Sequence, residues 1–470
     1  MEHFEKDALT LSAALDRGKL SAAELMQSTL DRIAAVNGKV NAIVGLRDPD
    51  VLMEEARAAD NAPRKGWLHG IPIAIKDLAN VKGERTTMGS PLFKDTVAPK
   101  DDLMVSRLRD AGALIIGKTN TPEFGLGSHT FNPIYGPTRN PYNLERSAGG
   151  SSGGAAVALA TRMLSVADGS DMMGSLRNPA GWNNVYGLRP TWGAVPAEPA
   201  GDVFMHHLST SGPMARSPAD LAALLDTMTG PDNRQPHSSF PGVATPMLSM
   251  PLSKQRIAWL GDWGGALPFE PGILELSEAA LRQMEEIGHH VEAIPAPFDA
   301  DQMWESWITL RSFSVAAGTH PLFSDPEKRA LLKRDALWEI ERGMTMPAME
   351  IHRASMTRSQ WFQRATQLFE EFDVLMLPSA QCWPFDVTLE HPKEINGVQM
   401  DTYHRWMQVV IPASLIGVPV VNIPIGFGDN GLPAGMQMIG ARTHAGRLLQ
   451  LAQDWHRATD WPNARPPVLD

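Results

Sequence analysis

Apolar residues recur at helical spacing in two well-separated parts of the chain. Ser21 and Glu24 have the spacing of a capping box, and the apolar positions that follow lie on one helical face: Met26, Leu30 and Ile33. A second stripe, which stops before Gly288, consists of Ile273, Leu276, Ala280, Met284 and Ile287. The pattern predicts an amphipathic helix near the N-terminus and another in the second half of the chain.

Short apolar runs between these helical patterns have the alternation or the length of strands. Ile71, Ile73 and Ile75 alternate along one such run, which places Lys76 and Asp77 at its end. Further runs of this kind cover residues 113–120, 164–171, 256–261, 291–295 and 373–379. Strands that alternate with helices indicate an α/β protein with a parallel or mixed sheet.

The stretch GGSSGGAAVALA, residues 149–160, has several possible structures. A phosphate-binding loop would need Lys after Gly154, where the chain has Ala155, and a flexible linker would not continue into a helix-forming segment. Residues 149–153 fit the nucleophile-elbow pattern G-x-S-x-G with Ser151 as nucleophile. The preceding sequence GPTRNPYNLERSA is polar, however, and an elbow follows a hydrophobic strand. The elbow therefore remains an alternative on the motif alone.

Charge and cysteine content exclude some classes of protein. The 470-residue chain has a net charge of −11, which argues against unassisted binding to nucleic acid or to an anionic membrane. Its one cysteine, Cys382, cannot form an internal disulfide. The start lacks the pattern of a secretory signal, and the apolar stretch 409–427 contains three prolines, which favours buried strands joined by turns over a membrane span. We expect a soluble cytoplasmic protein.

The chain shows no sequence feature that would divide it into separate domains. The length would suit about three domains of average size, but no repeat, low-complexity tract or long Gly/Ser linker divides the chain. We therefore expect one domain over residues 1–470. The segment of about residues 300–360 is rich in Trp and Met and has a helical pattern, so it is the expected insertion or lid. The sequence leaves the oligomeric state open, a homodimer included.

Three separate motifs carry a resemblance to a known family. Lys76 ends a strand, Ser151 follows 75 residues later in the glycine loop, and Ser175 follows 24 residues further on in DGSDMMGSLRNPAG. Together with GIPIAIKD, LRDAGALIIGKTNTPEFGLGS, GLRPTWG, DVLMLPS and GLPAGMQMIG, these motifs resemble the amidase signature family from about residue 10 to 460. The resemblance implies a single α/β/α domain with a mixed central sheet covered by helices.

The resemblance also implies a chemistry. Members hydrolyse C–N acyl bonds through a serine acyl-enzyme, without a metal or organic cofactor. Ser175 is similar to the family's nucleophile, Ser151 to the relay serine held in a cis peptide bond, and Lys76 to the base that starts the relay. Burial would lower the pKa of such a lysine. Without the resemblance, a pair between Lys76 and Asp77 at the strand end would be the favoured interpretation.

Further site residues follow from the same motifs. The backbone N–H groups expected to bind the oxyanion are those of Met172, Met173 and Gly174, with Ser175 itself. The residues expected to orient the site are Asp171, Arg177 and Ser152, and those expected to contact substrate are Gly127, Ser128 and Trp182. Most members have Gly where this chain has Met173, so either Met173 fits the turn with a negative φ or the loop has another shape.

Substrate class is the least constrained expectation. Aromatic and Met side chains gather in the sequence near Ser175 and in the expected lid: Met172, Met173, Trp182, Tyr186, Trp304, Trp307, Phe313, Trp338 and Met344. They favour hydrophobic amides, anilides, carbamates (urethanes) or esters as small-molecule substrates, although core packing explains these residues equally well. The alternatives are a glutaminase-type subunit of an aminoacyl-tRNA amidotransferase and an inactive binding scaffold.

Overall fold

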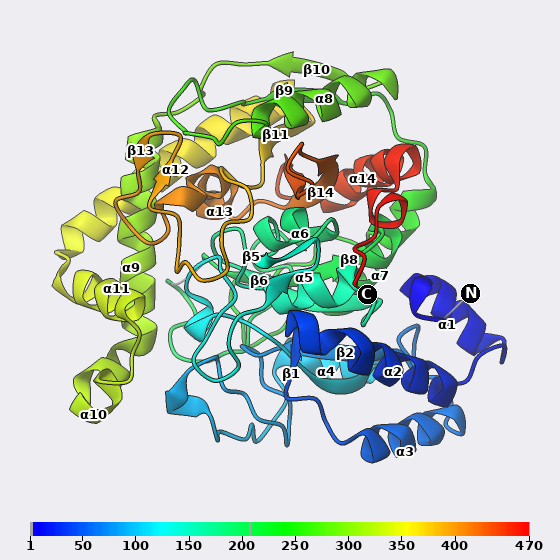
Figure 1. Ribbon diagram of the computed structural model, residues 1–470. Helices are drawn as coiled ribbons and strands as arrows, with labels where there is room; N and C mark the ends of the chain where they lie inside the picture. The colour runs from blue at the N-terminus through cyan, green and yellow to red at the C-terminus, as the bar shows by residue number, and fades with distance from the viewer. Residues whose placement is uncertain (1–2, 206–207, 470) are drawn as a thin grey trace.

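A mixed eight-stranded sheet lies at the centre of the described chain. The computed structural model describes residues 3–205 and 208–469, and the few remaining residues of the predicted domain lie outside these ranges (Figure 1). In spatial order the strands are β10 (His290–Ala293), β9 (Arg256–Trp259), β11 (Val374–Pro378), β15 (Pro433–Ile439), β14 (Val420–Phe427), β7 (Tyr186–Arg189), β8 (Thr210–Ala215) and β6 (Val166–Asp171). Strands β10, β9 and β11 run parallel, and the remaining pairs are antiparallel.

A second, smaller sheet carries the residues expected to start the relay. It has the order β1 (Ile43–Val44), β3 (Leu114–Thr119), β2 (Pro72–Lys76), and β2 is parallel to β3. The end of β2 meets the edge of the large sheet, because Lys76 N–H donates to Asp168 Oδ1 on β6 at 3.0 Å. Two short hairpins complete the strands: β4 (Arg139–Asn140) with β5 (Asn143–Ser147), and β12 (Glu394–Ile395) with β13 (Val398–Gln399).

Helices cover both faces of the central sheet, as the sequence predicted for an α/β/α arrangement. Outside the expected lid, the α-helices are α1 (Ala8–Asp16), α2 (Ala22–Val40), α3 (Pro49–Asp60), α4 (Leu103–Asp110), α5 (Gly153–Ala160), α6 (Asn178–Trp182), α7 (Pro218–Met228), α8 (Ile273–Glu286), α13 (Ile411–Ile416), α14 (Ala445–Thr459) and α15 (Trp461–Ala464). Short 3-10 turns are η1 (His3–Glu5), η2 (Pro91–Phe93), η3 (Glu123–Gly125), η4 (Thr245–Ser249) and η5 (Arg405–Val410).

Local sequence signals explain several of these elements. Ser21 Oγ accepts from Glu24 N–H at the start of α2, and the Glu24 carboxylate accepts from Ser21 N–H, so the predicted capping box is confirmed. Every residue of α5 is buried. Its small side chains permit that, because a Cβ added at Gly154 would lie 2.3 Å from Asn120 N.

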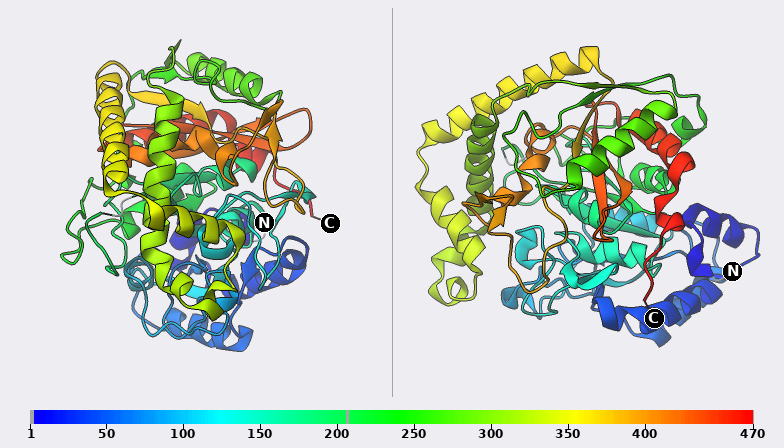
Figure 2. Two further views of the ribbon diagram at one scale, coloured as in Figure 1. Left: turned by 90° about the vertical axis from the view of Figure 1, so that its left-hand side faces the viewer. Right: turned by 45° about the horizontal axis from the view of Figure 1, so that its top comes forward.

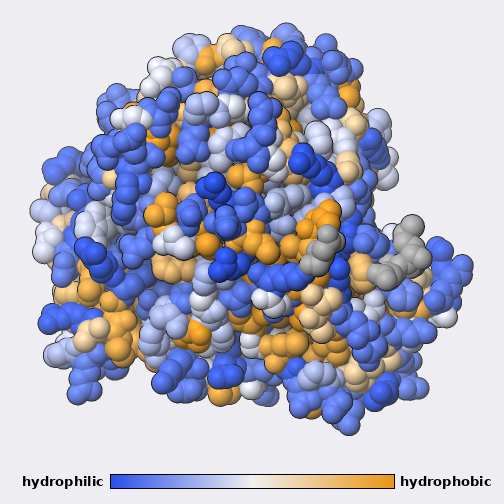
Figure 3. Space-filling model, in the orientation of Figure 1, coloured by the Kyte–Doolittle hydropathy of each residue, from blue (hydrophilic) through white to orange (hydrophobic). Residues whose placement is uncertain are grey.

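The apolar stretch 409–427 differs from its expected structure. Its first half is the end of η5 followed by α13, and only the second half is a strand, β14. Pro412 lies in the first turn of α13, where a missing N–H is harmless, and Gly417 ends the helix at φ +64°. The prediction of strands was therefore wrong for residues 411–416. No helix in the described residues is long and apolar enough to cross a membrane, and the face in Figure 3 shows scattered apolar patches in a largely polar surface.

The expected lid is helical and well packed. It consists of α9 (Ala300–Ser324), α10 (Pro326–Arg329), α11 (Arg334–Thr345) and α12 (Ala348–Glu371), with α9 and α12 along one side of the molecule (Figures 1 and 2). Trp304 and Trp307 are buried in a core that also contains Trp361. Most of the Trp content of this region therefore holds the helices against the sheet.

We propose that the chain is one cooperative domain. Ala8 and Leu9 near the N-terminus donate their N–H groups to the carboxylate of Asp220 on α7, and Arg107 on α4 donates to Met228 O, so early and middle segments are tied together. We expect a single thermal transition, and limited proteolysis that trims ends without releasing stable pieces. Two separable transitions, or a fragment that refolds alone, would contradict the proposal.

Candidate active site

Lys76 lies at the end of β2 with its amine surrounded by serine oxygens. The side chain is 1 % exposed, and Nζ donates to Ser151 Oγ at 2.7 Å, to Ser152 Oγ at 2.9 Å and to Ser170 Oγ at 3.0 Å. The Asp77 carboxylate has other partners: it accepts from Thr87 N–H at 3.1 Å and lies 3.8 Å from Lys118 Nζ. The structure thus brings Lys76 to the glycine loop and does not pair it with Asp77.

Burial changes the acid–base chemistry of this amine. Burial lowers the pKa of Lys76 to about 7, although the negative charges of Asp168 and Asp171 act in the opposite direction. An ordinary lysine is almost entirely protonated at neutral pH and cannot accept a proton. A large fraction of Lys76 is instead neutral near pH 7, as a general base requires.

The glycine loop is shaped by close neighbours. The peptide bond between Gly150 and Ser151 is cis, and Gly149 has φ +73°. A Cβ added at Gly149 would lie 2.4 Å from Asn178 Oδ1. The preceding strand β5 belongs to a two-stranded hairpin outside the central sheet, so the loop is not the strand–turn–helix of a nucleophile elbow.

Ser175 lies in the short loop between β6 and α6. It is 6 % exposed, and its side chain has no hydrogen-bond partner among the described residues. The expected bond between Ser151 and Ser175 is likewise not formed within the described ranges. Catalytic hydrogen bonds often tighten only when substrate is bound, so the two serines can still act together.

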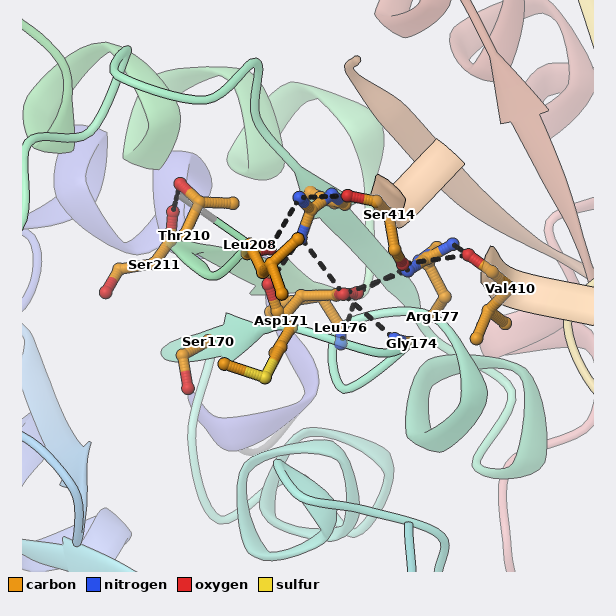
Figure 4. A network of polar contacts seen from close by, with 12 residues as sticks. Ser170, Asp171, Gly174, Leu176, Arg177, Leu208, Thr210, Ser211, Val410 and Ser414 are labelled. Carbon is orange, nitrogen blue, oxygen red and sulfur yellow. Dashed lines mark hydrogen bonds and ion pairs between the residues drawn. The ribbon is translucent and has the colours of Figure 1, made fainter. Parts of the chain in front are cut away.

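One carboxylate holds the Ser175 loop in place (Figure 4). Asp171 Oδ1 accepts from Gly174 N–H at 2.9 Å, and Asp171 Oδ2 accepts from Leu176 N–H at 3.1 Å. Arg177 forms two hydrogen bonds to the same carboxylate, both at 2.9 Å, and Arg189 NH1 lies 3.2 Å from Oδ1. Asp171 and Arg177 therefore occupy the orienting positions that the sequence suggested.

The backbone angles of the loop show how Met173 fits the turn before Ser175. Met173 is not among the residues at positive φ, whereas Gly174 has φ +83°, so the left-handed position falls on the glycine. Gly174 N–H is already bonded to Asp171, which removes it from the expected oxyanion donors in this structure. The N–H groups of Met172, Met173 and Ser175 have no hydrogen-bond partner among the described residues and can bind an oxyanion.

Three residues of the site were missed by sequence reasoning. Ser170 and Asp168 lie beside Lys76 on β6, and Arg189 on β7 is the second arginine of Asp171. The two-residue alternation along β6 was the available signal, since it places Val166, Asp168 and Ser170 on one face. Arg189 had no such signal, because its contact with Asp171 depends on the strand order.

The expected substrate-contacting residues have different positions. Gly127 is half-buried, at φ +93°, with open space where a Cβ would be. Ser128 Oγ bonds to Gly150 O and lies 3.0 Å from Asn178 Oδ1, so it links the two loops of the site. Trp182 is 1 % exposed and stacks on Trp406 at 5.8 Å. Trp182 is therefore a packing residue in this structure, and its expected contact with substrate stays a prediction.

No group of three or more His, Cys, Asp or Glu side chains among the described residues is arranged to hold a metal ion. The arrangement that the structure does provide is a buried amine, two serine hydroxyls and unpaired backbone N–H groups. Such a set can activate a serine, receive its proton and stabilise a tetrahedral oxyanion.

Comparisons with known proteins show that the chain is similar to amidases. A family model described as Amidase matches residues 24–449. The chain is 31 % identical over 466 residues to an acylamidase of Rhodococcus erythropolis, covering 98 % of this chain and 96 % of the relative. It is 33 % identical over 501 residues to one subunit of the glutamyl-tRNA(Gln) amidotransferase of Methylococcus capsulatus, covering 98 % of each chain.

Solved structures are similar over the full length. A bacterial aryl acylamidase of the amidase signature enzymes has a TM-score of 0.90 at 29 % identity, with 98 % of this chain and 99 % of that chain covered. The 6-aminohexanoate cyclic dimer hydrolase complexed with substrate has a TM-score of 0.88 at 26 % identity, with 100 % of both chains covered.

Gly174→Ala tests the loop geometry. The new Cβ would sit at φ +83° and 3.0 Å from the Val410 side chain, so we expect a loss of stability of about 1–2 kcal/mol or more, with a large loss of activity. Gly83→Ala is the matched control, because Gly83 has φ +82° and open space around it. Thermal unfolding and turnover would be measured for both. Equal effects in the two variants would show that the contact with Val410 is unimportant.

Proposed function

The chain belongs to the amidase signature family, and from this premise we propose that it hydrolyses the C–N acyl bond of hydrophobic amides through an acyl-enzyme on Ser175. The family membership makes it an amide-hydrolysing enzyme. The observation that carries the assignment of roles is the 2.7 Å hydrogen bond between buried Lys76 Nζ and Ser151 Oγ, next to a loop with an unpaired Ser175 hydroxyl.

The acylation step follows from these positions. Ser175 Oγ forms a bond to the acyl carbon, its proton passes to Ser151, and the Ser151 proton passes to neutral Lys76 Nζ. The carbonyl oxygen gains negative charge and is stabilised by the N–H groups of Met172, Met173 and Ser175. The C–N bond then breaks as the proton returns through Ser151 to the leaving nitrogen, which departs as a neutral amine.

Deacylation uses the same groups. Water takes the place of the amine and attacks the acyl carbon, its proton passes through Ser151 to Lys76, and the bond to Ser175 Oγ breaks as the proton returns to Ser175. Ser152 and Ser170 keep the amine in place throughout, since both lie within 3.0 Å of Nζ.

Support for a hydrophobic substrate comes only in part from the residues that the sequence suggested, since Phe313 of that set lines a cavity and several others are buried in the core. Trp182, Tyr186, Trp304 and Trp307 are buried in the core, and Met344 is half-exposed at the surface. A cavity of about 380 Å³ lies instead between α9, α12 and the segment before β8. Its lining is Met205, Leu208, Leu310, Phe313, Ser314, Ala348, Ile351, His352, Ser355 and Arg358.

Two sets of contacts join the wall of this cavity to the loop that carries Ser175. Leu208 O accepts from Arg189 NH2 at 2.9 Å, and Arg189 contacts Asp171. Leu310 precedes Arg311, whose NH1 lies 3.1 Å from Met172 Sδ. Six of the ten lining residues are apolar, and together with the position of the cavity they support an aryl or aliphatic group of the substrate at this place.

The glutaminase-type alternative is supported by the similarity to the amidotransferase of Methylococcus capsulatus. Such an enzyme would bind free glutamine and a partner protein. The apolar part of the cavity favours the stand-alone amidase, because a polar glutamine side chain left without partners there would cost about 1–3 kcal/mol.

Ser175→Ala tests the nucleophile. Loss of the attacking oxygen is expected to reduce kcat by about 10⁶-fold, to background, as for serine nucleophiles in general. Ser277→Ala is the control, since Ser277 is a buried serine whose hydroxyl donates to Ile273 O within α8 and has no other partner among the described residues; it should keep full turnover. Retention of more than a tenth of wild-type turnover in Ser175→Ala would reject the assignment.

A substrate panel tests the acyl and amine preference. We expect kcat/KM for anilides and aryl carbamates to exceed that for glutamine by well over tenfold, because burying about 100 Å² of apolar surface is worth about 2.5 kcal/mol. Hydrolysis of anilides, carbamates, short aliphatic amides, esters and glutamine would be compared at one pH. Equal or faster turnover of glutamine would overturn the preference and favour the amidotransferase alternative.

A further inference from the structure

The proposed relay places a positive charge on a lysine that is 1 % exposed. Each attack on the acyl carbon, in acylation and in deacylation, would place a proton on Lys76 Nζ until that proton returns through Ser151, and the hydrogen-bond acceptors of Nζ are oxygens of Ser151, Ser152 and Ser170. Within the described residues no carboxylate forms an ion pair with Lys76. A buried ammonium without a counter-charge is strongly disfavoured, so the base needs a negative group nearby.

The negative charges of two buried carboxylates on β6, Asp168 and Asp171, favour the protonated form of Lys76. Of the two, Asp171 is paired with arginine in the described part of the chain and Asp168 is not. Asp171 is neutralised by Arg177 at 2.9 Å and by Arg189 at 3.2 Å. Asp168 is 1 % exposed, has no arginine partner among the described residues, and accepts Lys76 N–H at 3.0 Å. Lys118 on β3 also acts on Asp168, and Lys118 lies 3.8 Å from Asp77.

We propose that Asp168 is a positioning residue for Lys76: its carboxylate holds the end of β2 through the Lys76 N–H and supplies the counter-charge for the ammonium formed during catalysis. The inference rests on the proposed function, because it concerns the proton that reaches Lys76 from Ser151. Asp168 touches no reacting atom and acts through the lysine, as the third group of a catalytic triad orients and balances its base.

The ionisation of the two groups is consistent with this role. Burial raises the pKa of Asp168 to about 6, against the hydrogen bond from Lys76 N–H and the charges of Lys76 and Lys118. Burial lowers the pKa of Lys76 to about 7. Near neutral pH the carboxylate is therefore charged when the lysine gains and loses its proton.

Asp168→Asn removes the charge and keeps an oxygen that can accept the Lys76 N–H. In the wild type, kcat/KM should rise with pH through about 7 as Lys76 becomes neutral. The variant loses the charge that favours the ammonium, so the pKa of Lys76 falls further and this acid limb should move to lower pH by about one unit. The plateau kcat should fall at least tenfold, because the ammonium formed in the relay is no longer balanced, while KM stays unchanged.

Two further variants separate this role from a structural one. Asp220→Asn is the matched control, because Asp220 is also buried and accepts the backbone N–H groups of Ala8 and Leu9. It should lower thermal stability without moving the acid limb. Asp168→Ser also removes the charge and leaves a smaller hydrogen-bond acceptor. This variant replaces Asp168→Asn in the experiment if Asp168→Asn does not fold.

The rate of Ser175 labelling by a sulfonyl fluoride gives a second pH profile that does not require amide turnover. A shifted limb in both profiles for the Asp168 variants, and not for Asp220→Asn, supports the proposal. An unshifted limb in a folded Asp168 variant overturns it, even if amide hydrolysis by the wild type is normal. If the wild type is labelled but hydrolyses no amide, the proposed function is rejected. The pH profile of labelling then decides by itself whether Asp168 acts on Lys76.

Discussion

The position of Ser175 depends on one buried carboxylate. Asp171 accepts two backbone N–H groups of the loop and lies between Arg177 and Arg189, all three side chains being fully buried. Burial raises the pKa of Asp171, but the charges of Arg177 and Arg189 outweigh it and hold the pKa well below its usual range. Removing one partner of such a cluster costs about 3–5 kcal/mol, since an unpaired charge would remain in the core. Arg177 extends the cluster to Gln437 Oε1 at 2.6 Å and Val410 O at 2.8 Å, so the loop is attached to β15 and to the segment before α13.

The opposite situation holds at Lys76. This amine has no ion-pair partner among the described residues, and its pKa is lowered by burial because only serine oxygens surround Nζ. Its neighbours come from the glycine loop and from β6, so the site forms where the small sheet meets the edge of the large one. A rigid salt-bridge cluster thus holds the nucleophile loop, while an adjacent buried and unpaired amine is left free to exchange a proton.

The helical region beside the site is also held by buried polar contacts. Arg311 on α9 bonds to Glu339 on α11 at 2.7 Å and to the Tyr403 hydroxyl at 2.7 Å. The remaining guanidinium nitrogen lies 3.1 Å from Met172 Sδ. These contacts make the region a fixed wall of the site. Its aromatic residues are mostly core residues, because Trp304 and Trp307 of α9 and Trp361 of α12 are buried in the same core as sheet residues such as Leu375.

The sequence by itself determined the α/β class, the capping box at Ser21, the end of β2 at Lys76 and the family that the three motifs identify, because these depend on local spacing and on residue types in sequence order. The division of roles among Lys76, Ser151 and Ser175 came from the resemblance and stays a proposal. Only the tertiary structure decided that Asp168 and Arg189 belong to the site, that Gly174 N–H is bonded to Asp171, and that Trp182 packs against Trp406. Each of these depends on which segments, distant in sequence, lie side by side. Burial and pairing of charges are properties of that arrangement, and no local pattern of residues encodes them.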